Sequence, residues 1–125
     1  MTPRRIFRWA AIYGLVILLP LYFAEPMAPR MGLPPFDHPE LLYGFVGAAA
    51  VMQLVYWTIG GDPPRYRPLM PLAVLAKLSF FVPVMLLALA GRVGGSTVPL
   101  AGGDGLLSIA FFMAWRRTPG TGGAP

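Results

Sequence analysis

The chain has 125 residues, of which 56% are hydrophobic and only 12% are charged. Soluble domains carry about 25% charged residues, so this chain has too few charges to cover a water-facing surface, and we expect it to lie in a lipid bilayer. It has no cysteine and one histidine, which excludes disulfides, thiolate metal sites and sites built from several histidines. The net charge of +5 comes from basic residues scattered at the predicted membrane boundaries. We therefore expect no nucleic-acid partner, no cofactor and no bound metal.

The first apolar segment predicts a transmembrane helix over residues 6–24. The arginines before it are similar to the start of a twin-arginine export signal, but the small residues expected before a cleavage site are missing. An uncleaved first membrane crossing is therefore the preferred interpretation. The five prolines between Glu25 and Glu40 forbid a continuous helix there and predict a turn-rich loop.

This loop contains the only neighbouring imidazole and carboxylates of the chain, and two interpretations of them remain open. A divalent metal with an open coordination position would use His38 with Asp37 or Glu40. The favoured alternative is that these residues begin the next helix. Pro39 then takes the first helical position, and the charge of Glu40 in the first turn complements the helix dipole.

The second predicted helix, residues 41–59, contains no charged residue. At 100° per residue its small residues Gly44, Gly47 and Ala48 lie on one face, and small residues allow membrane helices to approach closely. Gln53 lies on the opposite face. We therefore expect the small-residue face to pack against a neighbouring helix, a second copy of the chain or another membrane protein.

The third predicted helix, residues 70–90, contains Lys77, and a charge inside a membrane is costly enough to suggest a function. Counted from the helix ends, Lys77 and Gln53 lie at the same depth, so we expect a hydrogen bond between them. Tyr56 and Ser79 would complete a ligand-binding site. The favoured alternative is that the Lys77 side chain extends along its helix to the lipid headgroups, or that the polar contact only joins the two helices.

The fourth predicted helix, residues 98–115, contains Asp104 near the opposite membrane surface, where we expect Arg92 to pair with it. Together with His38 and Glu40, these residues form the candidate polar group of the outer face. A proton-relay function for Asp104 is an alternative interpretation. The Gly- and Pro-rich residues 118–125 are predicted to form a disordered tail.

The arginines beside the helix ends predict the orientation of the chain, because cytoplasmic loops are enriched in basic residues. With four crossings, seven arginines fall on one side: Arg4, Arg5, Arg8, Arg65, Arg67, Arg116 and Arg117. Trp9, Trp57 and Trp115 fall at the same interface, where indole rings are favoured. Residues 1–117 are thus predicted to form one all-α domain, a four-helix transmembrane bundle with both termini in the cytoplasm.

The segment from Asp62 to Met70, followed by Lys77-Leu78-Ser79, resembles a stretch of small, uncharacterised four-pass bacterial inner-membrane proteins that are DoxX-like in general plan. In such proteins an acid is expected beside the lysine, and Ala76 stands there in this chain. The resemblance implies the fold and a location in the bacterial inner membrane, and it implies no activity.

The sequence contains none of the motifs of a covalent nucleophile, a phosphate-binding loop or a zinc protease. We therefore expect a noncatalytic accessory or interaction subunit of the membrane, which associates either with a second copy of itself or with another membrane protein. The alternative is a small-molecule carrier or ligand-binding membrane protein with its polar site around Gln53 and Lys77. A membrane enzyme that uses the outer loop around His38 is the least favoured alternative.

Overall fold

The computed structural model describes residues 1–94 and 97–120, and this part of the chain contains helices and loops but no strand. The elements in chain order are α1 (Pro3–Leu18), the 3-10 helix η1 (Leu19–Phe23), α2 (Ala24–Met27), the 3-10 helix η2 (Pro29–Met31), α3 (Pro39–Gly61), the 3-10 helix η3 (Arg67–Leu69), α4 (Met70–Leu89) and α5 (Thr97–Arg117).

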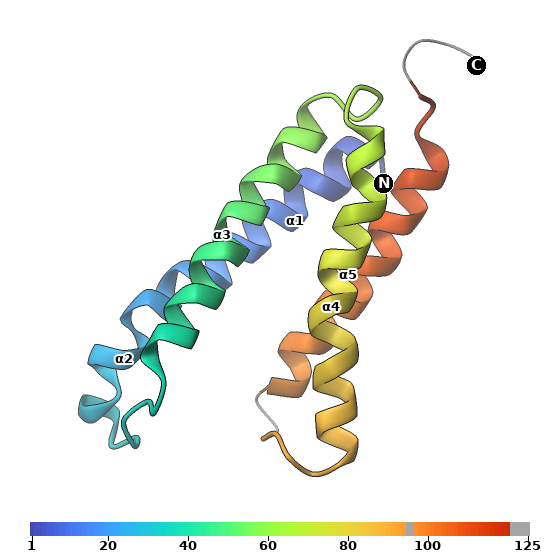
Figure 1. The fold of residues 1–125 in the computed structure, drawn as a ribbon. Coiled ribbons are helices and arrows are strands. Elements are labelled where there is room, and N and C mark those ends of the chain that lie inside the picture. The colour runs from blue at the N-terminus through green and yellow to red at the C-terminus, as the bar shows by residue number, and fades with distance from the viewer. Residues whose placement is uncertain (95–96, 121–125) are drawn as a thin grey trace.

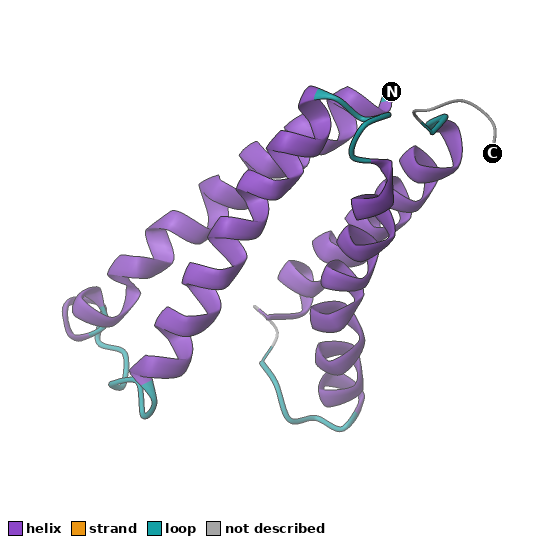
Figure 2. Cartoon of the chain, turned by 45° about the horizontal axis from the view of Figure 1, so that its top comes forward, coloured by secondary structure: helices purple, strands orange, loops and turns teal. Residues whose placement is uncertain are grey.

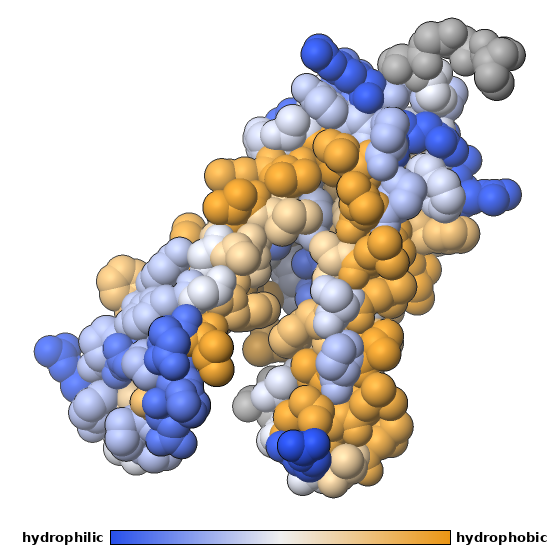
Figure 3. Space-filling view, in the orientation of Figure 1, coloured by the Kyte–Doolittle hydropathy of each residue, from blue (hydrophilic) through white to orange (hydrophobic). Residues whose placement is uncertain are grey.

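Four helical segments are long and apolar enough to cross a membrane: Pro3–Met27, Pro39–Gly61, Arg67–Leu89 and Thr97–Arg117. Large aliphatic side chains in the middle of these segments face outward; for example, Leu106 is 71% exposed. Soluble monomers rarely expose large continuous apolar surfaces. The visible face in Figure 3 has an apolar band between polar ends, as expected for a multi-pass membrane protein.

The first helical segment is longer than the sequence predicted, because its prolines do not end it where we expected. Pro20 lies at the start of η1, and Pro26 lies in the first turn of α2. At such positions the missing N–H of proline removes no helical hydrogen bond. The predicted loop therefore begins later, and it runs to His38 after the short helix η2.

The helices form two antiparallel hairpins, α1 with α3 and α4 with α5, which meet at one end and diverge at the other (Figure 1). The described parts of both termini lie at the end where the hairpins meet, as Figure 2 also shows. The main hydrophobic core lies at this joined end, since it contains the start of α1, the end of α3, the start of α4 and the end of α5. Phe7, Tyr56 and Phe111 are the largest aromatic side chains in it.

The joined end is also the arginine-rich end of the molecule. Arg8 lies over the ring of Trp57 at 3.9 Å, and Arg67 lies 5.4 Å from the ring centroid of Trp115. Arg67 Nε also donates to the backbone oxygen of Thr118 at 2.6 Å. Thr118 is buried, although we expected it in a disordered tail. Residues 121–125 of that predicted tail lie outside the described residues.

One close contact between α1 and α3 is at Gly14, which was not among the small residues predicted to pack. A Cβ added to Gly14 would collide with the side-chain amide of Gln53 on α3. On the other hairpin, a Cβ on Gly105 would lie 2.6 Å from Cε1 of Phe81 on α4. Small residues at these two positions therefore allow each hairpin to close.

Gly44 and Ala48 do not mark a close contact between α3 and a neighbouring helix of the bundle, which was one of the alternatives for this face. Both residues are exposed, and a Cβ on Gly44 would meet no other atom within 4 Å. A Cβ on Gly47 would make only an ordinary contact, 3.4 Å from the Tyr22 hydroxyl. The physical reason is rotation about the helix axis: α3 turns its polar Gln53 face toward α1 and turns Gly44 outward. Packing of that face against a second copy stays a prediction.

Replacing Gly14 with alanine is expected to destabilise the fold by about 1–3 kcal/mol, because the added methyl group overpacks the contact with Gln53. The matched control is Gly44→Ala, which adds the same group in open space and is expected to be neutral or slightly stabilising. Thermal unfolding in one detergent measures both variants. Equal stability of the two variants would contradict this assignment of the α1–α3 contact.

Candidate binding site between the hairpins

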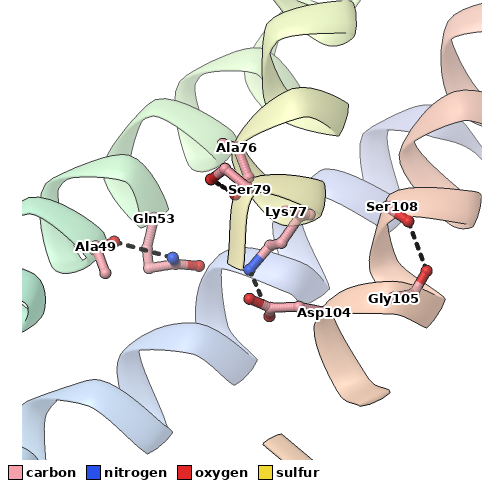
Figure 4. Close-up of polar contacts among 8 residues, drawn as sticks. All are labelled: Ala49, Gln53, Ala76, Lys77, Ser79, Asp104, Gly105 and Ser108. Carbon is pink, nitrogen blue, oxygen red and sulfur yellow. Dashed lines mark hydrogen bonds and ion pairs between the residues drawn. The ribbon is translucent and has the colours of Figure 1, made fainter. Parts of the chain in front are cut away.

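A buried ion pair connects α4 and α5 near the middle of the second hairpin. Lys77 Nζ donates to Asp104 Oδ1 at 3.1 Å, and the two side chains are 7% and 23% exposed. Figure 4 shows these side chains pointing toward each other from the two helices. Phe81 on α4 lies against Gly105 on α5, which is the neighbour of Asp104. Lys77 comes one helical turn before Phe81, and its long, flexible side chain spans that turn to reach Asp104.

This pair corrects two sequence-based expectations. Lys77 does not bond to Gln53, and it does not extend toward the headgroups, since its ammonium is buried against Asp104. Asp104 pairs with Lys77 rather than with Arg92, which is exposed. The acid that the sequence lacks beside Lys77 is therefore supplied by another helix.

Within the described residues, only one of the two polar atoms of the Gln53 side-chain amide has a hydrogen-bond partner. Its Nε2 donates to the backbone oxygen of Ala49 at 2.9 Å, one turn earlier on α3. Its Oε1 is buried without a hydrogen-bond partner and lies against Gly14. Burying an amide oxygen without a partner costs about 1–3 kcal/mol, so the α1–α3 contact carries an unpaired acceptor beside the cavity described next.

A cavity of about 290 Å³ lies between the two hairpins and is called the central cavity here. Its polar lining residues are Tyr13, Gln53, Tyr56, Lys77, Ser79 and Asp104. The apolar residues that line it toward the diverging end include Ile17, Leu18, Leu21, Phe45, Phe80 and Leu100. Its volume is at the lower end of the range of about 300–1,000 Å³ for small-molecule sites in proteins.

The central cavity has a polar end and an apolar end. On α3 the order from the joined end outward is Tyr56, Gln53, then Phe45; on α5 it is Asp104, then Leu100. The other two helices follow the same order from polar to apolar. Figure 3 shows the hollow between the hairpins with apolar atoms on both sides of its opening.

Two aromatic contacts define the walls of the central cavity. Phe45 on α3 and Phe80 on α4 stack with their ring centroids 5.5 Å apart, which connects the hairpins on that side. At the polar end, Lys77 Nζ lies 5.3 Å from the ring centroid of Tyr56, within the range of a cation–π interaction of about 6 Å. The ammonium is thus held by one carboxylate and one aromatic ring.

The predicted site residues are thus brought together only in part. Gln53, Tyr56, Lys77 and Ser79 all line the central cavity, but the Ser79 hydroxyl donates to the backbone oxygen of Ala76 and makes no contact with Lys77. Asp104, which we assigned to the outer face, belongs to this group. Sequence analysis missed Tyr13 and the apolar walls, because aromatic and aliphatic residues give no signal in a membrane segment.

The polar residues of the outer loop lie at the surface of the molecule. His38 Nδ1 lies 3.2 Å from Glu40 Oε1, and both side chains are about 70% exposed. No group of three histidine, aspartate or glutamate residues within residues 1–94 and 97–120 has the geometry to hold a metal ion. α3 begins at Pro39 with Glu40 in its first turn, so the helix-start interpretation of this segment is confirmed.

No protein-family model, curated protein sequence or solved structure matches this chain. The resemblance of the segment from Asp62 to Met70 to DoxX-like proteins therefore stays a prediction. The proposed function is therefore based on the residues that line the central cavity.

Proposed function

We propose that this chain is a noncatalytic multi-pass membrane protein that binds a small ligand in its central cavity. The single observation that carries the proposal is the buried pair of Lys77 and Asp104 at the polar end of a cavity between two helical hairpins. Ionisable residues inside a membrane usually mark a binding site or a path for ions or substrates.

The energetics of the pair support a function over a purely structural role. Removing two charges from water costs several kcal/mol per ion, and a buried pair is often no more stable than well-packed apolar residues of similar volume. Two aliphatic residues would therefore join α4 and α5 equally well. The pair also lines a cavity instead of being sealed in a packed core, so its polar atoms are available to a ligand.

The proposal includes the location and orientation that the basic residues favour. Seven arginines lie toward the joined end, and the indoles of Trp57 and Trp115 lie beside two of them. Basic residues favour the cytoplasmic side, and indole rings favour the interface. We therefore place the joined end and both termini at the cytoplasmic face of a bacterial inner membrane, with the apolar end of the cavity toward the outer leaflet.

An accessory function through protein contacts is the second candidate, and one observation favours it. Gly44 lies exposed on the outward face of α3, with the exposed Ala48 between it and the central cavity, and small residues there would let a second transmembrane helix approach closely. Such a partner, either a second copy or another membrane protein, would contact the face of α3 that points away from α1. It would leave the ion pair in place.

Filling the central cavity tests the ligand-binding proposal. We expect the protein purified in mild detergent to carry a bilayer-derived small molecule that native mass spectrometry detects. We expect the Ala49→Phe variant to lose most of this molecule, because Ala49 lines the cavity. The matched control is Val51→Phe, which adds the same ring on the exposed side of α3. Both variants are first checked for a monodisperse profile. An empty wild-type protein, or equal loading of the two variants, would argue against ligand binding in this cavity.

A further inference from the structure

The polar end of the central cavity displays unused hydrogen-bonding capacity on both charged residues. Within the described residues, the only hydrogen-bond partner of Lys77 Nζ is Asp104, although an ammonium has three donors. A carboxylate accepts at both of its oxygens, and among the described residues the carboxylate of Asp104 accepts a hydrogen bond only at Oδ1. A ligand bound here therefore meets a donor and an acceptor side by side.

The charges at this end select against an ionised ligand. The pair of Lys77 and Asp104 is neutral as a whole, and no other charged residue lines the central cavity. An anionic group would lie beside the Asp104 carboxylate, and a cationic group would lie beside the Lys77 ammonium. Because a net charge in a low-dielectric site is costly without a compensating partner, an uncharged polar group fits better.

The remainder of the cavity is suited to an apolar chain. Leu21, Phe45, Phe80 and Leu100 follow the polar residues toward the diverging end, and no polar residue accompanies them there. A volume of about 290 Å³ leaves room for a small polar group and part of one chain, so the rest of the chain must extend out between the hairpins. The walls at that end are apolar, which allows the chain to continue into the lipid.

From these observations we infer that the ligand is a single-chain amphiphile with an uncharged hydroxyl head, whose oxygen accepts from Lys77 Nζ and whose proton is donated to Asp104. The inference rests on the proposed ligand-binding function and specifies its substrate class. The apolar chain occupies the outer part of the cavity, so the ligand enters from the bilayer and not from water.

The test measures how tightly single-chain amphiphiles with different head groups bind to the whole protein in detergent micelles. Native mass spectrometry gives the affinities. The probes are oleyl alcohol, methyl oleate, oleic acid and oleylamine, with glycerol as a hydroxyl compound that has no chain. We expect the alcohol to bind about tenfold more tightly than the ester, which has no donor, because one hydrogen bond to a charged group is worth about 1.5 kcal/mol or more. The two ionisable probes are expected to bind more weakly than the alcohol, and glycerol is expected not to bind.

The double variant Lys77→Met with Asp104→Leu is the matched control, because it removes both polar partners and keeps the apolar walls. In this variant the alcohol and the ester should bind equally. If the wild-type protein binds both probes equally, or prefers the acid or the amine, the inference about the head is overturned and the ligand-binding function stands. Binding of glycerol as tight as that of the alcohol overturns entry from the bilayer. If no probe binds, both the inference and the proposed function fail.

Discussion

Asp104→Leu is expected to destabilise the folded chain by about 3–5 kcal/mol, because it leaves the Lys77 ammonium buried without a counter-charge. Lys77 is 6% exposed, and no other carboxylate lies in the central cavity to replace Asp104. Lys77→Met is expected to lower the stability less than Asp104→Leu does. The Asp104 side chain is 23% exposed, so its carboxylate stays partly accessible to solvent when Lys77 is removed. Both stabilities are measured by unfolding in mixed micelles.

The double variant Lys77→Met with Asp104→Leu decides whether this cost comes from the unpaired charge. Its stability is expected to be within about 1 kcal/mol of the wild type, because apolar residues of similar volume often replace a buried pair without loss. Glu40→Leu is the control at the exposed pair with His38, where we expect a loss of about 1 kcal/mol or less. A double variant as unstable as Asp104→Leu would show that the pair itself holds the second hairpin together.

Phe7→Ala is expected to cost about 3 kcal/mol and to loosen the two hairpins from each other. Phe7 is fully buried on α1 and stacks on Phe111 of α5 with the ring centroids 4.4 Å apart. Its ring also lies 6.4 Å from that of Tyr56 on α3. A bilayer supplies little hydrophobic driving force between helices, so the joined end depends on close packing, which this truncation removes.

The matched control for Phe7→Ala is Phe112→Ala on α5. Phe112 is 47% exposed and makes an edge contact with Trp115, so its loss leaves no enclosed void. We expect a change of less than about 1 kcal/mol there. Thermal unfolding compares the two variants, and ligand loading reports on the central cavity. Equal losses of stability in the two variants would contradict the assignment of Phe7 as the main contact between the hairpins.

The four long apolar helical segments could be predicted from sequence because they depend on local composition. Stretches of about 20 apolar residues satisfy their backbone hydrogen bonds as helices whatever their neighbours are. The start of α3 at Pro39 was also predictable, since proline and an acidic residue in the first turn act within a few residues of the helix end. The end of the first segment was not, because Pro20 and Pro26 fall at positions where proline is tolerated.

The composition of the candidate site was harder to predict, as Lys77 and Asp104 show. Counting residues from the helix ends gives the depth of a Cα atom in the membrane. This count placed Lys77 and Asp104 in opposite halves of the membrane. The calculation leaves out the length of a lysine side chain and the rotation of each helix about its axis. Gly14 was missed for a related reason: one glycine in an apolar helix has no signal until a large side chain from another helix lies against it.

The four long apolar helices and the unequal distribution of arginines follow from the amino-acid sequence alone, because they depend on composition and on interactions within one segment. The pairing of Lys77 with Asp104, the packing of α3 through Gln53 with Gly44 exposed, and the cavity between diverging hairpins emerge only in the folded molecule. These features depend on the rotation and crossing of helices that are all apolar. With similar hydrophobicity on every face, close packing and a few polar contacts determine which faces meet.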